Sequence, residues 1–222
     1  AAARGVSWLL DLQNADGGWP TFCRGWGALP FDRSGVDLTA HALRALHAWR
    51  DRHEAGPRIE TAIRRGLAYL AAQQRSDGHW VPLWFGNQYH PEEENPVYGT
   101  GRVLLAYRDL DLLDSPAPQR GLKWLAANQN PDGGWGGDLS GSSVEETAVA
   151  VEALLPARVT SPFGEAVEAG LEWLVGAVES GRVRHAAPIG FYFAKLWYYE
   201  RLYPLVFSVA ALGRALAGQP PS

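Results

Sequence analysis

The sequence predicts an all-α protein built from repeated pairs of helices. One block of similar residues occurs three times: RGVSWLLDLQNADGGW at 4–19, RGLAYLAAQQRSDGHW at 65–80 and RGLKWLAANQNPDGGW at 120–135. Apolar residues recur at helical spacing inside each block, and alternation typical of β-strands is scarce in the chain. The Trp residues that end the blocks are 61 and 55 residues apart, a period typical of stacked helix pairs.

The first helix of each pair lies within the repeated block. In the first copy, Val6, Leu9 and Leu10 have the spacing of one helix face. Asp-Gly then ends the helix, because Gly readily adopts the left-handed conformation found at helix ends. A fourth copy starts at Ala169 as AGLEWLVGAVESGR, which keeps Trp173 but lacks the Gln and the terminal Trp.

A second helix is predicted after each block. The sequences DLTAHALRALHAW, GTGRVLLAYRDL, ETAVAVEALLPA and FSVAALGRALAG have the required periodicity, at 37–49, 99–110, 146–157 and 207–218. We therefore predict about four helix pairs in a single helical-repeat domain over residues 1–222, stacked as in solenoids and toroids.

The Gln and Trp of each block are predicted to join neighbouring repeats. The Gln amide can satisfy backbone groups left unpaired at the start of the next helix, and the indole can cover that contact. The alternative is a set of plain helix caps, each closed by an aromatic side chain. The residues concerned are Gln13, Trp19, Gln74, Trp80, Gln129 and Trp135.

Composition excludes some classes of protein. The 222 residues are 46% hydrophobic and carry a net charge of −4, which makes nucleic acid a poor partner. The single cysteine, Cys23, cannot form an internal disulfide and fits a reducing compartment. No run of residues is long and apolar enough for a spanning helix. Because the chain contains no Met, we expect it to be part of a longer protein.

The repeated block resembles the QW repeat of the triterpene cyclases, a family that includes squalene–hopene cyclase and the oxidosqualene cyclases. Further stretches are similar to other segments of that family. They are SGVDLTAHAL at 34–43, NPVYGTGRVLLAY at 95–107, NQNPDGGWGGD at 128–138, and YERLYP followed by ALGRA within 199–215.

This resemblance implies a fold and a reaction. The family's fold is a pair of (α/α) barrels around a large cavity, and the chain matches the C-terminal portion, a partial (α/α)6 barrel. The implied enzyme is an isomerase of triterpenoid biosynthesis, a cyclase that protonates squalene or a related polyprenoid. No metal or organic cofactor is expected. The family's acid motif, Asp-x-Asp-Asp, is absent from the sequence, so we expect the chain alone to be inactive.

Asp37 and His41 are the predicted catalytic residues. Four residues apart, they lie on one face of a helix. The resemblance implies that this pair holds the acid ready, and a protonated His beside a carboxylic acid would favour loss of its proton. An ordinary surface pair at this spacing is the alternative.

Aromatic residues are predicted to line the substrate cavity. A π face attracts a carbocation and offers no lone pair to trap it. By resemblance, we expect this role for Trp84, Tyr98, Phe191 and Tyr199. An aromatic-rich helix that simply forms core is the alternative for the segment 189–204.

Two other interpretations of the site are weaker. The stretch YHPEEEN at 89–95 has metal-ligating side chains, but its crowding beside a proline favours a solvated loop. The protein prenyltransferase β-subunits share the helical barrel, but Cys23 lacks the Asp-x-Cys of their zinc site.

The resemblance implies a cytoplasmic protein with peripheral, monotopic membrane contact, and an open toroid favours a homodimer. Two other functions stay open. One is a non-catalytic helical module that binds a lipid or a protein partner. The other is an enzyme of the same fold with a different prenyl substrate.

Overall fold

The computed structural model describes residues 2–21, 32–52, 54–137, 141–191 and 196–218, without the side chains at 188, 189 and 191. Cys23 lies outside these residues. The described chain is mostly helical, which confirms the predicted fold class. Its α-helices are α1 Ala2–Leu12, α2 Val36–Trp49, α3 Gly56–Gln73, α4 Pro96–Asp109, α5 Pro116–Ala127, α6 Val144–Leu154, α7 Phe163–Glu179 and α8 Tyr203–Ala217. Short 3-10 turns follow α2, α6 and α7, at Arg50–Arg52, Leu155–Ala157 and Arg182–Arg184.

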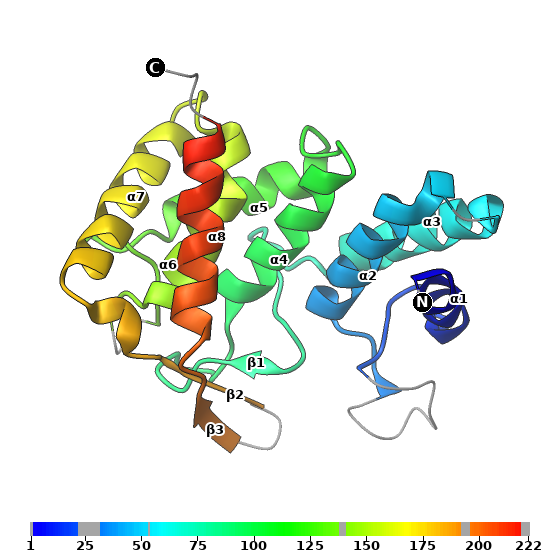
Figure 1. Cartoon of the computed structure of the whole chain (residues 1–222), viewed down its shortest axis with the longest axis horizontal. Helices are drawn as coiled ribbons and strands as arrows, with labels where there is room; N and C mark the ends of the chain where they lie inside the picture. The colour runs from blue at the N-terminus through cyan, green and yellow to red at the C-terminus, as the bar shows by residue number, and fades with distance from the viewer. Residues whose placement is uncertain (1, 22–31, 53, 138–140, 192–195, 219–222) are drawn as a thin grey trace.

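The helices form two rows. The second helices of the four pairs pack side by side in chain order, α2 against α4, α4 against α6 and α6 against α8. The first helices, α1, α3, α5 and α7, pack against this inner row, and α7 and α1 lie at opposite ends of the molecule (Figure 1). Every residue of α6 is buried, because α6 has neighbours on all sides.

Several helices begin earlier than predicted, and α3 and α8 are two examples in which the first turn contains a proline. Helix α3 begins at Gly56, nine residues before the repeated block, because Pro57 is well suited to the first turn of a helix. Helix α8 begins at Tyr203 and has Pro204 in the same place. The apolar periodicity of both segments is interrupted near these prolines, and the sequence pattern therefore gave starts that were too late.

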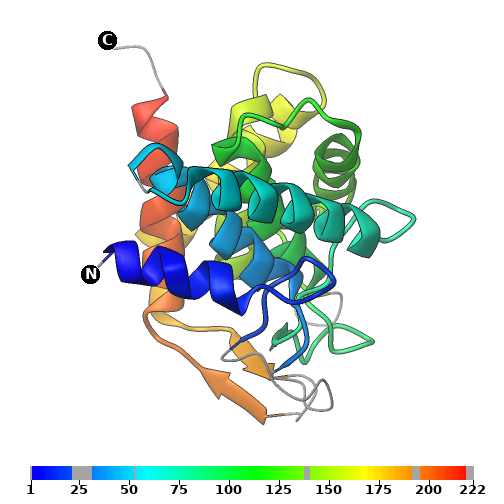
Figure 2. The same ribbon diagram turned by 90° about the vertical axis from the view of Figure 1, so that its right-hand side faces the viewer.

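A small antiparallel sheet lies at one end of the helices (Figures 1 and 2). Its order is β1 Phe85–Gly86, β2 Pro188–Phe191, β3 Leu196–Tyr199, with Phe85 opposite Phe191 and Gly190 opposite Trp197. The alternative that residues 189–204 form an aromatic-rich helix is therefore wrong for the residues of β2 and β3. Consecutive aromatic residues favour extended backbone, and their pairing partner β1 is about 100 residues away in sequence.

The three Gln side chains make the same two hydrogen bonds. Each Nε2 donates to the carbonyl of the Gly four residues later, at 2.7–2.8 Å, and to an Ala carbonyl of the next outer helix, at 2.8–2.9 Å. The Ala acceptors are Ala62, Ala117 and Ala166. The Gln therefore joins neighbouring repeats, but through carbonyl oxygens rather than the unpaired amides of a helix start.

The three Trp residues link three elements each. Their indole N–H groups donate to a Leu carbonyl ten residues earlier in the outer helix, at 2.7–2.8 Å. Their backbone N–H groups donate to a Thr hydroxyl of the following inner helix, at 2.9–3.0 Å. All three Trp side chains are at most 1% exposed. The alternative, in which they only close a helix cap, does not account for their bonds to the following inner helix. The Thr partners are Thr39, Thr100 and Thr147.

The Asp-Gly turn before each Trp needs glycine. Gly17, Gly78 and Gly133 have φ values of +94°, +113° and +89°, where other residues are strained. A Cβ at Gly17 would also lie 2.5 Å from the carbonyl oxygen of Arg65 in the next outer helix. The turn therefore packs directly against the following repeat.

Candidate functional site

The Trp–Thr bonds set the inner helices in one register. Because Thr39, Thr100 and Thr147 occupy equivalent places, residues at one offset from them fall at equivalent points of the inner row. Two residues before the Thr lie Asp37, Tyr98 and Glu145, and two residues after it lie His41, Arg102 and Val149. The repeat thus aligns polar side chains of different kinds near the starts of α2, α4 and α6.

Asp37 is a buried carboxyl group in the first turn of α2. It is 1% exposed, and its Oδ1 atom has no hydrogen-bond partner in the part of the chain that is described. Burial raises the pKa of Asp37 to about 6, although the backbone amides of Asp37, Leu38 and Leu83 and the charge of Arg102 partly oppose that rise. Asp37 can therefore exchange a proton near neutral pH.

His41 lies one turn further along α2, with its side chain exposed. Protein atoms still crowd the ring, and the resulting loss of hydration lowers the pKa of His41 to about 4, with help from the charges of Arg102 and Arg44. His41 is therefore neutral at pH 7. No ion pair or hydrogen bond joins Asp37 to His41 within the described residues. The carboxyl group of Asp37 is buried, whereas the imidazole of His41 is exposed. The two residues therefore do not form an ordinary surface pair.

Four residues, Phe85, Tyr98, Tyr203 and Phe207, form an aromatic cluster, and Tyr98 is close enough to Asp37 to be affected by its charge. Ring centroids are 4.8 Å apart for Phe85 and Tyr98, and 5.3 Å apart for the stacked Tyr203 and Phe207. Phe85 connects the two pairs at 6.4 Å from Tyr203. The cluster draws on β1, α4 and α8, so the fold assembles it from segments more than 100 residues apart.

Arg102 covers the aromatic cluster. Its Cζ lies 4.8 Å from the ring centroid of Tyr98 and 4.5 Å from that of Phe207. The side chain is 9% exposed, and its Nε has no hydrogen-bond partner among the described residues. Sequence reasoning did not single out Arg102. Its position four residues after Tyr98, one helical turn away, is the signal that could have found it.

The four predicted cavity aromatics differ in their surroundings. Trp84 is 4% exposed and donates its indole N–H to the Thr21 hydroxyl, and Tyr98 is 7% exposed. The backbone of Phe191 pairs with Phe85, but its side chain lies outside the described part. Tyr199 is 61% exposed.

Tyr198, next to Tyr199 on β3, is turned toward the aromatic cluster. Burial and the neighbouring Tyr203, with which it hydrogen-bonds, raise the pKa of Tyr198 to about 12. Side chains alternate between the two faces of a strand, so only one of Tyr198 and Tyr199 can point toward the cluster. The sequence does not determine which of the two it is. The structure brings Tyr98 and Tyr198 together and leaves Tyr199 facing out.

A second pair of carboxyl groups lies in the first turn of α6. Glu146 accepts hydrogen bonds from Asn87 Nδ2 at 3.0 and 3.2 Å and from the Ser143 hydroxyl at 2.7 Å, and burial raises its pKa. Glu145 accepts from the Ala187 amide at 2.7 Å, and burial raises its pKa to about 7. These glutamates connect α6 to the loop after β1 and to the segment before β2.

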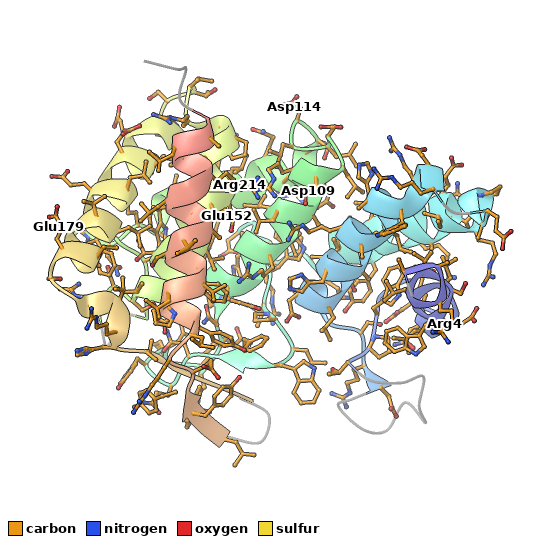
Figure 3. All side chains as sticks on the ribbon, in the orientation of Figure 1. Arg4, Asp109, Asp114, Glu152, Glu179 and Arg214 are labelled. Atoms are coloured by element: carbon orange, nitrogen blue, oxygen red, sulfur yellow. The ribbon has the colours of Figure 1, made fainter. Side chains whose placement is uncertain are left out.

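A strip of ion pairs crosses the inner row nearer the C-terminal ends of its helices. Asp109 binds Arg44 at 2.6 Å and Arg108 at 2.5 Å, and Glu152 binds Arg214 at 3.1 Å and Arg108 at 3.7 Å. Figure 3 shows Glu152 on α6 beside Arg214 on α8. The strip therefore links α2, α4, α6 and α8 at a level distinct from that of Asp37.

Two kinds of feature are absent from the described residues. None of their helices combines the length and the apolar character that crossing a bilayer requires. No three of their His, Cys, Asp and Glu side chains are grouped so that they could hold a metal ion. In the stretch 89–95, Glu94 instead forms an ion pair with Arg75 at 3.8 Å.

Comparison with known proteins gives a consistent result. The family described as squalene-hopene cyclase C-terminal domain matches residues 1–217. The chain is 30% identical to a squalene–hopene cyclase of Bradyrhizobium diazoefficiens, over 79% of this chain and 28% of that protein. It is 34% identical to a drimenyl diphosphate synthase of Streptomyces showdoensis, over 79% of this chain and 30% of that protein.

Solved structures show the same fold. The ent-copalyl diphosphate synthase from Streptomyces platensis is 25% identical, with a TM-score of 0.65, over 94% of this chain and 36% of that chain. The chain spans between 15% and 30% of the length of the curated relatives that it matches.

Proposed function

Because the chain belongs to the squalene-hopene cyclase C-terminal domain family, we propose that it forms part of a cavity where a polyprenoid is cyclised. The reaction begins when a proton is added to a carbon–carbon double bond and ends when the final carbocation loses a proton. Since the chain spans under a third of its relatives, this activity belongs to a full-length cyclase of their size.

The observation that carries the proposal is the buried carboxyl of Asp37 beside neutral His41 and the aromatic cluster. Asp37 and His41 would hold the protonating acid in place, with the imidazole free to accept a hydrogen bond. The π faces of Trp84 and of the aromatic cluster would stabilise carbocations without reacting with them. A preorganised wall of this kind needs no reorientation while charge develops.

The substrate we propose is squalene or a related polyprenoid. The relatives' names include a squalene cyclase and a diphosphate synthase, so an uncharged and a charged polyprenoid are both candidates. Without an Asp-x-Asp-Asp motif, the chain by itself is expected to form no cyclic product. A cyclic product from this chain alone would contradict that expectation.

The test is product formation by the full-length cyclase and its variants, followed by gas chromatography and mass spectrometry. Asp37→Asn and His41→Gln should each lower turnover by about 100-fold or more, as expected when an acid–base group is lost. Asp51→Asn, a change to an 84% exposed side chain outside the site, is the matched control and should leave turnover unchanged. Full turnover in both site variants would refute the assigned roles.

A non-catalytic helical module is the second candidate function. The observation in its favour is the exposed apolar face of β3 and α8, formed by Leu196, Leu202, Leu205, Val206, Val209 and Leu216. Lipid bound by the full-length protein without any turnover would favour this module. Peripheral membrane contact, homodimerisation and a cytoplasmic location remain predictions.

A further inference from the structure

Arg102 places a permanent positive charge against two rings of the aromatic cluster. Its guanidinium carbon is 4.8 Å from the ring centroid of Tyr98 and 4.5 Å from that of Phe207, and its side chain also hydrogen-bonds Tyr98. The residue is 9% exposed, so little water weakens these contacts. Attraction between a cation and a ring face is strongest when the cation is desolvated. The two rings therefore already hold a cation in the folded chain.

The guanidinium lies on the inner face of the helix row. Arg102 belongs to α4, yet it contacts Phe207 of α8, and α6 stands between those two helices. Helices α5 and α7 cover the other side of α6, so the side chain must cross the face of α6 that points away from them. A Cβ on Gly101 would lie 2.3 Å from Val149 Cγ1, and this close approach of α4 to α6 keeps the crossing short.

The charge of Arg102 also acts on the neighbouring helix α2. Burial and then the charge of Arg102 lower the pKa of His41, which makes a second positive charge there less stable. Burial raises the pKa of Asp37, and the charge of Arg102 opposes part of that rise. A substrate carbocation beside the two rings would meet the same repulsion, because like charges repel strongly where water is excluded.

We propose that Arg102 is a specificity-determining residue, which occupies the cation-binding faces of Tyr98 and Phe207 and excludes a substrate carbocation from them. This inference rests on the proposed function and deepens it, because it restricts the carbocation to rings away from Arg102, such as Trp84 and Phe85. Cyclisation then ends at an earlier cation. One C–H bond beside that cation breaks, its electron pair becomes a double bond, and the proton passes to a water molecule.

The test is binding of choline, a small quaternary ammonium ion, to the full 222-residue chain. NMR follows the ring signals of Tyr98 and Phe207, so it reports on the site itself and detects weak binding. Arg102→Ala frees the ring faces and should bind choline about tenfold or more tightly than wild type. Arg102→Lys should remain like wild type, because it keeps a positive charge beside the rings.

Two controls separate charge from shape and from place. The first is a neutral alcohol of the same shape, in which carbon replaces the nitrogen of choline, and Arg102→Ala should bind it more weakly than choline. The second is Arg58→Ala, since Arg58 is a 63% exposed arginine paired with Asp11 on the outer row. This variant should bind choline as weakly as wild type.

Circular dichroism shows whether each variant folds. If Arg102→Ala does not fold, Arg102→Met takes its place, because Met removes the charge and keeps an unbranched side chain in the same space. Equal affinity of wild type and the uncharged variant for choline would overturn the inference, whether both bind or neither does. Equal affinity of that variant for choline and for the neutral alcohol would overturn it too, since the rings would then not recognise charge.

A second readout is the ratio of products made by the full-length cyclase. Arg102→Ala should raise the share of more highly cyclised products, measured by gas chromatography and mass spectrometry, and Arg102→Lys should keep the wild-type ratio. An unchanged ratio in Arg102→Ala would contradict the role in specificity. A full-length protein that forms no cyclic product refutes the proposed function, and the choline titration still decides whether Arg102 occupies a cation site.

Discussion

The indole of Trp80 occupies the space that a side chain on Gly121 would need. A Cβ built on Gly121 would lie 2.7 Å from Cζ3 of Trp80, closer than real Cβ atoms approach. The same relationship holds between Trp19 and Gly66 and between Trp135 and Gly170. In each block after the first, the Gly therefore admits the Trp of the preceding repeat into the interface between helices.

We predict that Gly121→Ala lowers the free energy of unfolding by about 1–3 kcal/mol, because the added methyl group overpacks the Trp80 pocket. Urea denaturation measures the effect. Gly176→Ala in α7 is the control, since a Cβ there would meet nothing within 4 Å. It should stabilise by about 0.5–1 kcal/mol, as Ala does in a helix. Equal effects at both positions would contradict the packing argument.

The second prediction concerns the Gln of the repeat. Gln74→Ala should lower the free energy of unfolding by about 1–3 kcal/mol, because two hydrogen bonds to buried or partly buried carbonyls are lost. The adjacent Gln73 is exposed at the end of α3, and Gln73→Ala should change stability by less than about 0.5 kcal/mol. Thermal unfolding of the two variants side by side decides whether position 74 links the repeats.

The third prediction is a pH dependence that comes from Asp37. Its pKa rises on folding from 3.8 to about 6, so the folded state binds more protons than the unfolded state between these values. Stability contributed by the protonated carboxyl is present below pH 4 and is lost as pH rises through 6. Asp37→Asn should therefore match wild type near pH 4 and exceed its stability by about 2–3 kcal/mol above pH 7.

Urea titrations of both proteins from pH 4 to pH 8 test this expectation. Asp51→Asn changes an exposed carboxyl, and its difference from wild type should stay within about 0.5 kcal/mol at every pH. A constant gap between Asp37→Asn and wild type would show that the folded pKa of Asp37 is not raised.

The fourth prediction compares equivalent hydroxyl groups in two repeats. Thr147 Oγ1 accepts a hydrogen bond from the Trp135 amide at 2.9 Å, whereas Ser208 Oγ on α8 is buried without a partner among the described residues. Thr147→Val should cost about 1–3 kcal/mol, because it leaves a buried amide unpaired. Ser208→Ala should be neutral or stabilising, which differential scanning calorimetry can measure. Equal destabilisation by the two changes would contradict this difference.

Much of the fold was predictable because its determinants are local. Helix periodicity, the Asp-Gly turn and the spacing of Gln and Trp all lie within about 16 residues, so the repeated blocks located the outer helices. The Gly of Arg-Gly and the Thr of α2, α4 and α6 recur as regularly, but their roles involve a partner in another element. The sequence pattern therefore shows the Gly without a reason for it, and it gives the Thr no special weight.

The candidate site was predictable only in part. Asp37, His41 and Tyr98 were selected, since each belongs to a short motif. Arg102 was not, because its significance comes from Phe207, which lies 105 residues later and on another helix. The hairpin of β2 and β3 was missed for a similar reason, as its strand pairing with Phe85 is a long-range contact.

The sequence by itself determined the repeated helix pair, the residues that join one repeat to the next, and the family. These follow from local periodicity and from motifs at fixed spacing. Only the tertiary structure decided which polar groups are buried, that Tyr198 rather than Tyr199 is turned toward the aromatic cluster, and that Arg102 stacks on rings from both α4 and α8. The physical reason is that burial and charge pairing depend on neighbours in space, and the packing of α4, α6 and α8 brings those neighbours together.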